Sequence, residues 1–165
     1  MDVPTLLAGI DFARARLIGI LDAIERSGQN PAAVLAWRPG PGRAHIAWQA
    51  MHCAATHDRY LNVRIRGGAE TDPDLVKRFA GGSTPSDDDV PALATVREKL
   101  ATHLHQFREY VSNLSPADLA RSLEFPNNVR RTVGESIVLL TWHEAHHQGQ
   151  IHLTWNMYKA AHGVK

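Results

Sequence analysis

The sequence predicts an all-α fold, a four-helix bundle with a long crossover between its second and third helices, on three observations. Four stretches repeat apolar residues at spacings of three and four, which is the period of a helix with one buried face. No stretch alternates apolar and polar residues between hairpin turns, as a half-buried strand would. A chain of 165 residues has the length of one ordinary domain, so we expect residues 1–165 to form a single helical domain.

The first half of the chain carries two of the predicted helices. The first is expected to begin near Pro4, since proline is favoured in an opening helical turn, and to end at SGQNP, residues 27–31. The second is expected from about Ala44 to Arg66, between PGPGR and the helix-breaking pair Gly67-Gly68. Their apolar stripes are Leu6, Leu7, Ile10, Leu17, Ile20, Leu21 and Ile24 in the first helix, and Ile46, Ala50, Cys53, Tyr60 and Leu61 in the second.

A long polar segment follows the second helix. Residues 67–89 contain four glycines, two prolines and an acidic run, and only the stretch DPDLVKRFA within them favours a short helical turn. This segment is predicted to be the crossover of the bundle. The third helix is then expected from Val90 to about Asn113, with the stripe Leu93, Val96, Leu100, Leu104, Phe107 and Val111.

Capping signals place the last two helices. Ser115 is a good N-cap and Pro116 suits a first helical position, so LSPADL is expected to open a short helix. Thr132 and Glu135 have the spacing of a capping box, so the fourth long helix is expected from Val133 to about Ala161. Roughly eight turns of helix are long enough to span the domain.

The fourth long helix carries the candidate functional residues. Histidines four residues apart lie one above the other, so the imidazoles of His143 and His147 can both reach one metal ion. Burying two imidazoles side by side costs desolvation free energy, and a metal ion would satisfy one nitrogen on each. We therefore expect a metal site here, with Glu144 and His146 pointing elsewhere. The inward stripe is Val133, Ile137, Leu140, His143, His147, Ile151, Thr154 and Tyr158.

A third ligand is expected from the second helix, because catalytic zinc usually takes three protein ligands and keeps one position open. His52 and His57 are five residues apart and face different sectors of this helix, so at most one of them faces the metal comfortably. His52 is preferred by a thin margin because it lies nearer the middle of the helix, and His57 is assigned to the rim or to a position behind the ligands. Solvated or rim positions are also expected for His45, His103, His105 and His162.

The sequence HEAHH, residues 143–147, also matches the H-E-x-x-H signature of zinc peptidases, in which the glutamate acts as general base. The extended form of that signature needs glycine at 150 and histidine at 153, where this chain has Gln150 and Leu153. The shorter form needs a downstream glutamate ligand, and no acidic residue follows His152. Together with the lack of predicted strands, these differences argue against a peptidase.

The composition narrows the choice of partners and location. The formal net charge is +1 and no long basic stripe occurs, which argues against nucleic acid binding. Charged residues interrupt the N-terminal segment and no apolar run reaches the length of a membrane span, so neither a signal peptide nor a membrane protein is expected. The single cysteine, Cys53, cannot form an intramolecular disulfide, which favours a reducing, cytoplasmic setting.

Three segments carry a combined pattern: AWQAMHCAATHDRYL on the second helix, LVKRFAGGSTPSDDD in the crossover, and HEAHHQGQIHLTWNMY on the fourth helix. Together they resemble the DinB/YfiT-like superfamily of metal-binding helical bundles, which is distinct from the DNA polymerase of the same name. The most specific part is H-x-x-x-H-x-G-Q-[IL] combined with one histidine on the second helix. The resemblance implies a three-histidine metal site at His52, His143 and His147, and so selects His52 over His57, which stands where many members carry a glutamate.

The resemblance also implies an activity. The superfamily includes thiol-dependent S-transferases and isomerases that use low-molecular-weight thiols such as bacillithiol or mycothiol, and other members are described as metal-dependent hydrolases. We therefore expect a divalent-metal enzyme with Zn²⁺ or Ni²⁺ that acts on a small-molecule substrate as a homodimer, either as an S-transferase with a low-molecular-weight thiol as cofactor or as a hydrolase. Cys53 is left out of the mechanism, because it is turned about 100° from His52 on the helix.

The alternative is a non-catalytic, metal-stabilised dimeric bundle that acts as a stress-response accessory. An enzyme should have a pocket above the metal, whereas a structural site should be closed by a fourth protein ligand. Aromatic residues on the helices are candidates for the wall of such a pocket, although core or dimer-interface positions are the commoner use of such residues. These residues are Trp48, Trp142, Trp155 and Tyr158.

Overall fold

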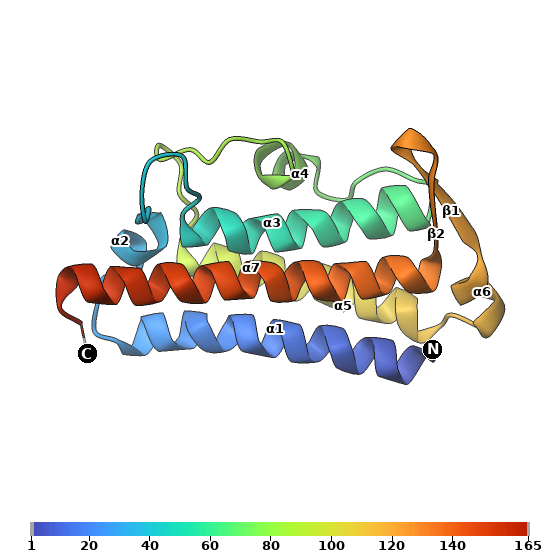
Figure 1. Ribbon diagram of the computed structural model, residues 1–165, viewed down its shortest axis with the longest axis horizontal. Helices are drawn as coiled ribbons and strands as arrows, with labels where there is room; N and C mark the ends of the chain where they lie inside the picture. Colours follow the sequence, from blue (N-terminus) through green and yellow to red (C-terminus); the bar gives the residue numbers. More distant parts are fainter. Residues whose placement is uncertain (1, 165) are drawn as a thin grey trace.

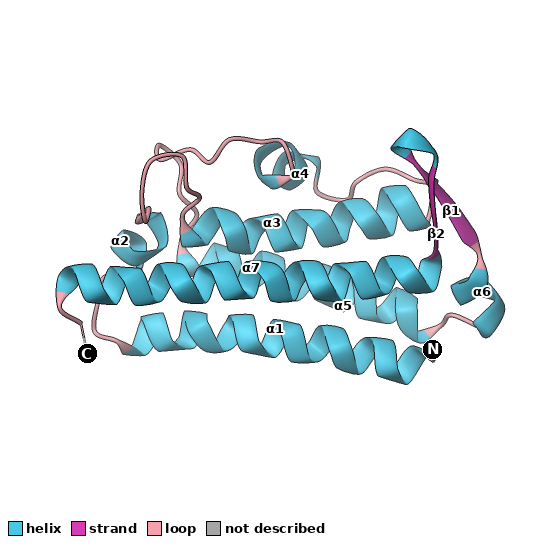
Figure 2. Cartoon of the chain, in the orientation of Figure 1, coloured by secondary structure: helices cyan, strands magenta, loops and turns pink. Residues whose placement is uncertain are grey.

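The computed structural model describes residues 2–164, and helices make up most of them (Figure 2). The all-α class predicted from the periodicity is confirmed. Within residues 2–164, no helix is both long enough and apolar enough to cross a lipid bilayer. In chain order the elements are α1 (Val3–Arg26), α2 (Pro31–Ala36), α3 (Ile46–Asp58), the π-helix η1 (Arg59–Ile65), α4 (Pro73–Phe79), α5 (Leu93–Ser112), α6 (Pro116–Ala120), β1 (Ser122–Phe125), the 3-10 helix η2 (Pro126–Asn128), β2 (Val129–Thr132) and α7 (Val133–His162).

The long helices lie side by side along the molecule (Figure 1). α7 packs against α1 and α3, and α5 packs against the same two helices, so the four enclose a common interior. α4 packs on the outside of α3, while α2 contacts α1, α3 and α5 near the end of the molecule where the chain ends. The hairpin of β1 and β2 lies at the opposite end, next to the start of α7.

Two apolar clusters fill the interior, and a layer of polar side chains separates them. One cluster includes residues of α2 and α4, and the other includes residues of α6 and β1. On each long helix the two clusters are interrupted by a buried polar residue, which the apolar stripe alone does not predict. These residues are Arg14 on α1, His57 on α3, His103 on α5 and Glu144 on α7. In the sequence, His143 directly precedes Glu144 and His52 lies five residues before His57.

The predicted second helix is divided into two kinds of helix. The α-helix begins at Ile46, with His45 as its N-cap, and from Arg59 to Ile65 the chain continues as a π-helix. The wider turn is visible in the bond from the Arg66 backbone N–H to the Leu61 carbonyl oxygen, five residues earlier, at 3.0 Å. π-helical turns are rare and frequently occur at functional sites, because they change which residues share a face.

A short hairpin contradicts the expectation that the chain has no strands. β1 and β2 pair antiparallel, with Ser122 opposite Thr132 and Phe125 opposite Val129. Asn127 and Asn128 form the turn with φ values of 64° and 58°, and asparagine tolerates this left-handed conformation better than most residues. The strands are only four residues long: β1, SLEF, alternates polar and apolar residues over too few positions to be recognised, and β2, VRRT, does not alternate.

Other boundaries agree more closely with the sequence. α7 begins at Val133 behind the predicted capping box, in which Thr132 and Glu135 exchange hydrogen bonds, and the helix ends before Gly163. The expected helical turn in residues 67–89 is α4, whereas α5 begins at Leu93 rather than at Val90. α2 was not predicted, because a helix of six residues is too short to show a period.

Candidate metal centre

The structure brings together three histidines from two helices. His52 projects from α3, and His143 and His147 project from α7. Each offers one ring nitrogen, and these three nitrogens lie within 4.8 Å of one another. The closest pair is His52 Nε2 and His143 Nε2, at 3.0 Å. These are the three histidines that helical facing and the family resemblance selected.

His52 is held in a defined orientation. Its Nδ1 lies 2.6 Å from the carbonyl oxygen of Phe79, so Nδ1 carries the proton and donates it. The indole of Trp48, one helical turn earlier, stacks on the imidazole with 4.8 Å between ring centroids. Nε2 of His52 therefore presents its lone pair to the other two histidines, as a metal ligand oriented by a backbone carbonyl does.

All three imidazoles are neutral near pH 7. Burial, with the nearby imidazole of His52 as the next cause, lowers the pKa of His143 to about 4. Burial likewise lowers the pKa of His147 to about 3, with His143 as the next cause, and it lowers the pKa of His52. Because only the neutral imidazole has a free lone pair, the donor set fits a divalent cation that prefers nitrogen ligands.

A pocket of about 390 Å³ opens beside these histidines. The wall comes from α3, η1, the chain after α4 and the hairpin, which are far apart in the sequence. The residues that line the pocket are His52, Thr56, Arg59, Tyr60, Arg64, Ala80, Gly81, Phe125, Pro126 and His143. Two of the three histidines, His52 and His143, line this pocket, and a pocket beside the ligands is typical of catalytic metal sites, which keep one position open. Another hollow of about 480 Å³, between η1 and α5, has no histidine in its lining.

Most of these wall residues were not recognised from the sequence as part of a site. Thr56 and Arg59 lie about 40° and 20° from His52 around an α-helix, so their spacing could have indicated a shared face with the candidate ligand. Arg64 could not have been placed in this way, because a regular α-helix would turn it about 120° from His52, and its position on the wall depends on the π-helix. Nothing in the sequence indicated that Phe125 of the hairpin returns to the same pocket.

Glu144 takes part in a buried network rather than in the metal site. Its side chain is 0% exposed and binds the guanidinium of Arg14 through both carboxylate oxygens, with Arg14 Nη2 donating to Oε2 at 2.9 Å. His57 Nε2 lies 3.1 Å from the same oxygen. Burial alone would raise the pKa of Glu144, but the charge of Arg14 and the contact with His57 hold it at about 2. The carboxylate is therefore charged, paired and turned away from the pocket, which removes the general base that a peptidase of this motif requires.

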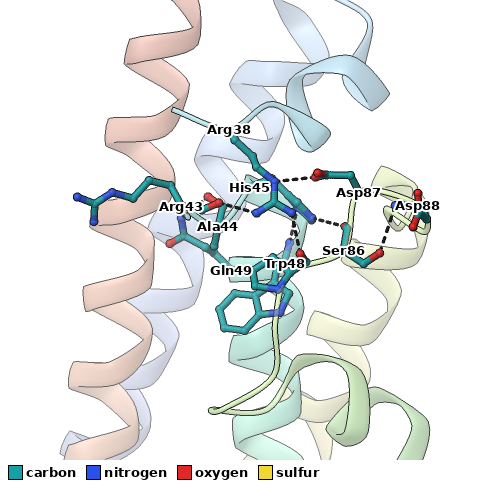
Figure 3. A network of polar contacts seen from close by, with 10 residues as sticks. Arg38, Arg43, Ala44, His45, Trp48, Gln49, Ser86, Asp87 and Asp88 are labelled. Atoms are coloured by element: carbon teal, nitrogen blue, oxygen red, sulfur yellow. Dashed lines mark hydrogen bonds and ion pairs between the residues drawn. The ribbon is translucent and has the colours of Figure 1, made fainter. Parts of the chain in front are cut away.

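Three histidines lie deeper than predicted. His57 and His103 are 1% and 3% exposed, because both side chains point into the polar layer between the apolar clusters. The rim position is therefore wrong for His103, and for His57 it is the wrong one of the two positions expected. His45 is also buried, since its Nδ1 accepts a hydrogen bond from the Trp48 backbone N–H and its Nε2 lies 3.1 Å from the Ser86 carbonyl oxygen (Figure 3). The exposed positions predicted for His105 and His162 are confirmed.

Only one of the four candidate aromatic residues contacts the histidine site. Trp48 stacks on His52, whereas Trp142 is 59% exposed on the outer face of α7. Trp155 and Tyr158 pack against each other near the other end of α7, where Trp37 meets Tyr158 edge to face.

Comparison with known proteins agrees with this arrangement. The family model described as the DinB superfamily matches residues 10–151, which include His52, His143 and His147. A search of curated proteins gives no match. The crystal structure of a conserved protein from Enterococcus faecalis is similar over 95% of this chain and 97% of its own, with a TM-score of 0.77 and 15% sequence identity, a likeness that concerns the fold alone. Since the family model matches well over half of the chain, the protein belongs to the DinB superfamily.

Proposed function

We propose that this protein is a divalent-metal-dependent enzyme whose ligands are His52, His143 and His147. The observation that carries the proposal is the meeting of three neutral imidazoles, with one nitrogen of each within 4.8 Å of the others, beside a pocket that His52 and His143 line. No fourth histidine, cysteine or carboxylate joins the group within residues 2–164, which favours an open coordination position over a closed structural site.

Zn²⁺ and Ni²⁺ are the metals that suit an all-imidazole ligand set. Such an ion supplies Lewis acidity, which lowers the pKa of a bound thiol or water near neutral pH. The reaction is accordingly the transfer of a low-molecular-weight thiol to a small-molecule substrate, or a hydrolysis. The chain has no accessible thiol of its own, since Cys53 is fully buried and burial raises the pKa of its thiol well above the usual value. This favours an external thiol.

The residues around the site have separable roles in this proposal. The Phe79 carbonyl oxygen accepts a hydrogen bond from Nδ1 of His52 and so keeps the proton on that nitrogen. Nε2 is then unprotonated and oriented to bind a metal ion. Trp48 covers one face of the same ring and limits the access of water. The pocket beside His52 and His143 receives the substrate.

A homodimer is part of the proposal, and the outer face of α7 supports it. Large apolar side chains are exposed along this face, whereas the outer face of a solvated helix is normally polar. They are Val138, Trp142, Leu153 and Met157. Gly149 and Gln150 lie between them, where the small residue permits a close approach. Leu153→Glu should convert the dimer to a monomer in analytical ultracentrifugation, while His105→Glu, on the exposed face of α5, should not.

The remaining expectations belong to the same proposal. Residues 1–165 form one domain, a four-helix bundle in which the segment between η1 and α5 is the crossover, and the enzyme works in the cytoplasm. The interior that α1, α3, α5 and α7 share supports the four-helix bundle. The single cysteine, which is not in a disulfide, supports a reducing compartment such as the cytoplasm.

Elemental analysis by mass spectrometry tests the proposal first. Protein purified without an affinity tag, before and after chelation, should contain about one zinc or nickel ion per chain, and His52→Ala and His147→Ala should lose it. His105→Ala is the matched control and should keep full occupancy, since its side chain is exposed on α5. Equal occupancy in all variants would refute the ligand assignment. A metal-free wild type, even after reloading, would favour the alternative of a non-catalytic dimeric stress-response bundle.

A further inference from the structure

Two arginines on the wall of the metal-site pocket have no acidic partner. Six arginines among residues 2–164 pair with carboxylates, as Arg14 does with Glu144. Within residues 2–164, neither Arg59 nor Arg64 has a carboxylate oxygen within 4.0 Å or a side-chain hydrogen bond. Both side chains are half-buried, and none of the residues that line the pocket is acidic. The pocket therefore holds two positive charges that nothing in its own wall balances.

The π-helix is what places both arginines on one wall. In an α-helix, residues five apart point in directions about 140° from each other, because each residue turns by about 100°. In a π-helix the hydrogen bonds join residues five apart, so Arg59 and Arg64 lie one turn above the other. Thr56 and Tyr60 precede them on the same wall, beside the ligand His52.

The rest of the pocket is suited to a carbon skeleton. The rings of Tyr60 and Phe125 are 6.0 Å apart between centroids, and Pro126 adds a further apolar surface. Gly81 approaches the imidazole of His52 closely, since a Cβ added at this glycine would lie 3.9 Å from its ring. The cavity thus offers two cations, an apolar wall and a route to the three histidines.

We propose that the substrate or thiol that enters this pocket is a small organic anion, whose carboxylate or phosphate group binds Arg59 and Arg64 while its reacting end reaches the histidine site. This inference rests on the proposed function for the reacting end. The anion requirement itself depends only on the two arginines, because two guanidinium groups in a half-buried wall bind an oxyanion with paired, charge-assisted hydrogen bonds. A neutral molecule of the same size would leave them unpaired.

Matched probes separate the anion from the reacting group. 3-Mercaptopropionate and 3-mercapto-1-propanol have the same chain length and the same thiol, but only the first carries a carboxylate. In isothermal titration of the zinc-loaded protein, the acid should bind at least about 10-fold more tightly than the alcohol. In the Arg59→Gln/Arg64→Gln double variant the preference should fall to about 2-fold or less, with zinc content and the affinity for the alcohol unchanged. Equal affinities in the wild type would overturn the inference.

Two further variants guard against indirect effects. Arg16→Gln removes an exposed arginine of α1 outside the pocket and should retain the full preference for the acid. Arg59→Lys/Arg64→Lys retains both charges and should recover part of the preference lost with glutamine. If the Arg16 variant loses as much of the preference for the acid as the double variant does, the preference reflects the overall charge of the protein. Binding of the anion by Arg59 and Arg64, the anion clamp, would then be excluded.

The metal-free protein distinguishes failure of this inference from failure of the proposed function. 3-Phenylpropionate and 3-phenyl-1-propanol carry no thiol, so neither needs the metal to bind. In an NMR titration, the acid should shift the backbone amide signals of residues 59–65, while the alcohol should not. This result from a chain that takes no metal would support the anion clamp and refute the metal enzyme. No preference for the acid in either form of the protein would refute the clamp.

Discussion

His143 and Glu144 are neighbours on α7, yet they belong to two buried polar regions with opposite properties. His143 faces the pocket, has no acidic partner, and is neutral because burial lowers its pKa to about 4. Glu144 is turned about 100° away, faces the interior, and is charged because Arg14 and His57 outweigh the effect of burial. The first region has free lone pairs and can bind a ligand. The second has its charges paired within the protein, so its role is structural.

The largest expected effect comes from breaking the interior pair. Arg14→Met leaves the Glu144 carboxylate buried without its main countercharge, and this should cost about 3–5 kcal/mol in the free energy of unfolding, measured by urea denaturation. The double variant Arg14→Met/Glu144→Leu should be less destabilised than Arg14→Met alone, because it leaves no buried charge. Removing the exposed Arg130–Glu124 pair should have a much smaller effect. A single variant as stable as the wild type would remove the structural role assigned to this network.

The pocket region should respond to metal instead. Chelation should lower the melting temperature of the wild type by about 5–10 °C, since a ligand present at about 100 times its dissociation constant stabilises a protein by about 2.7 kcal/mol. His52→Ala, which removes one ligand, should melt at the same temperature with and without chelator. Arg14→Met should keep the metal-dependent difference although its baseline is lower. Loss of that difference in Arg14→Met would show that the two regions are coupled.

The pH dependence of the metal-free protein sharpens the contrast. The unfolded chain takes up protons on its histidines near pH 6.5, whereas folded His143 and His147 resist protonation until about pH 4 and about pH 3. The unfolded state therefore binds more protons as the pH falls below 6.5, and stability is lost from there downward. The melting temperature should fall by about 5 °C between pH 7 and pH 5.

Removing the two histidines provides the control for this titration. The variant His143→Leu/His147→Leu should show a smaller decrease between pH 7 and pH 5, because two of the groups that remain neutral on folding are gone. The paired Glu144 should not contribute there, since its pKa of about 2 lies below both its unfolded value of 4.5 and the range tested. An identical decrease in the double variant would assign the effect to the other buried histidines.

The smallest expected effect concerns Trp48. Trp48→Leu removes the indole stacked on His52 but keeps an apolar side chain, so the fold should be retained. A stacked aromatic pair contributes about 1 kcal/mol beyond its buried area, which corresponds to about a 5-fold loss of zinc affinity in a competition titration with a chromogenic chelator. Trp142→Leu, on the exposed face of α7, should leave the zinc affinity unchanged.

The sequence predicts the helices and the histidine cluster because both depend on local spacing. His143 and His147 share a face of a regular α-helix, and capping residues mark where that helix begins, so the registers of prediction and structure agree. His52 lies in the α-helical part of its segment, where the same rule holds.

The prediction fails where an interaction joins distant segments or where the helical period changes. Glu144 was assigned away from the site because it is off the apolar stripe, and nothing local indicates that Arg14, 130 residues earlier, meets it in the interior. His103 was misplaced for the same reason, since it interrupts the stripe of α5 at the level of the polar layer. The position of Arg64 could not be predicted, because a period of 3.6 residues does not apply in the π-helix that lies between it and His52.

The polar layer also determines how far α7 can slide along its neighbours. Moving α7 by one helical turn would displace Glu144 by about 5.4 Å, break its contacts with Arg14 and His57, and leave charged groups facing apolar side chains. Apolar packing alone distinguishes weakly between the observed position of α7 and one shifted by a helical turn, because a different apolar side chain then fills the same space. The Arg14–Glu144 pair thus acts as an axial lock for α7. By opposing such a shift, it keeps His143 level with His52, where their Nε2 atoms are 3.0 Å apart.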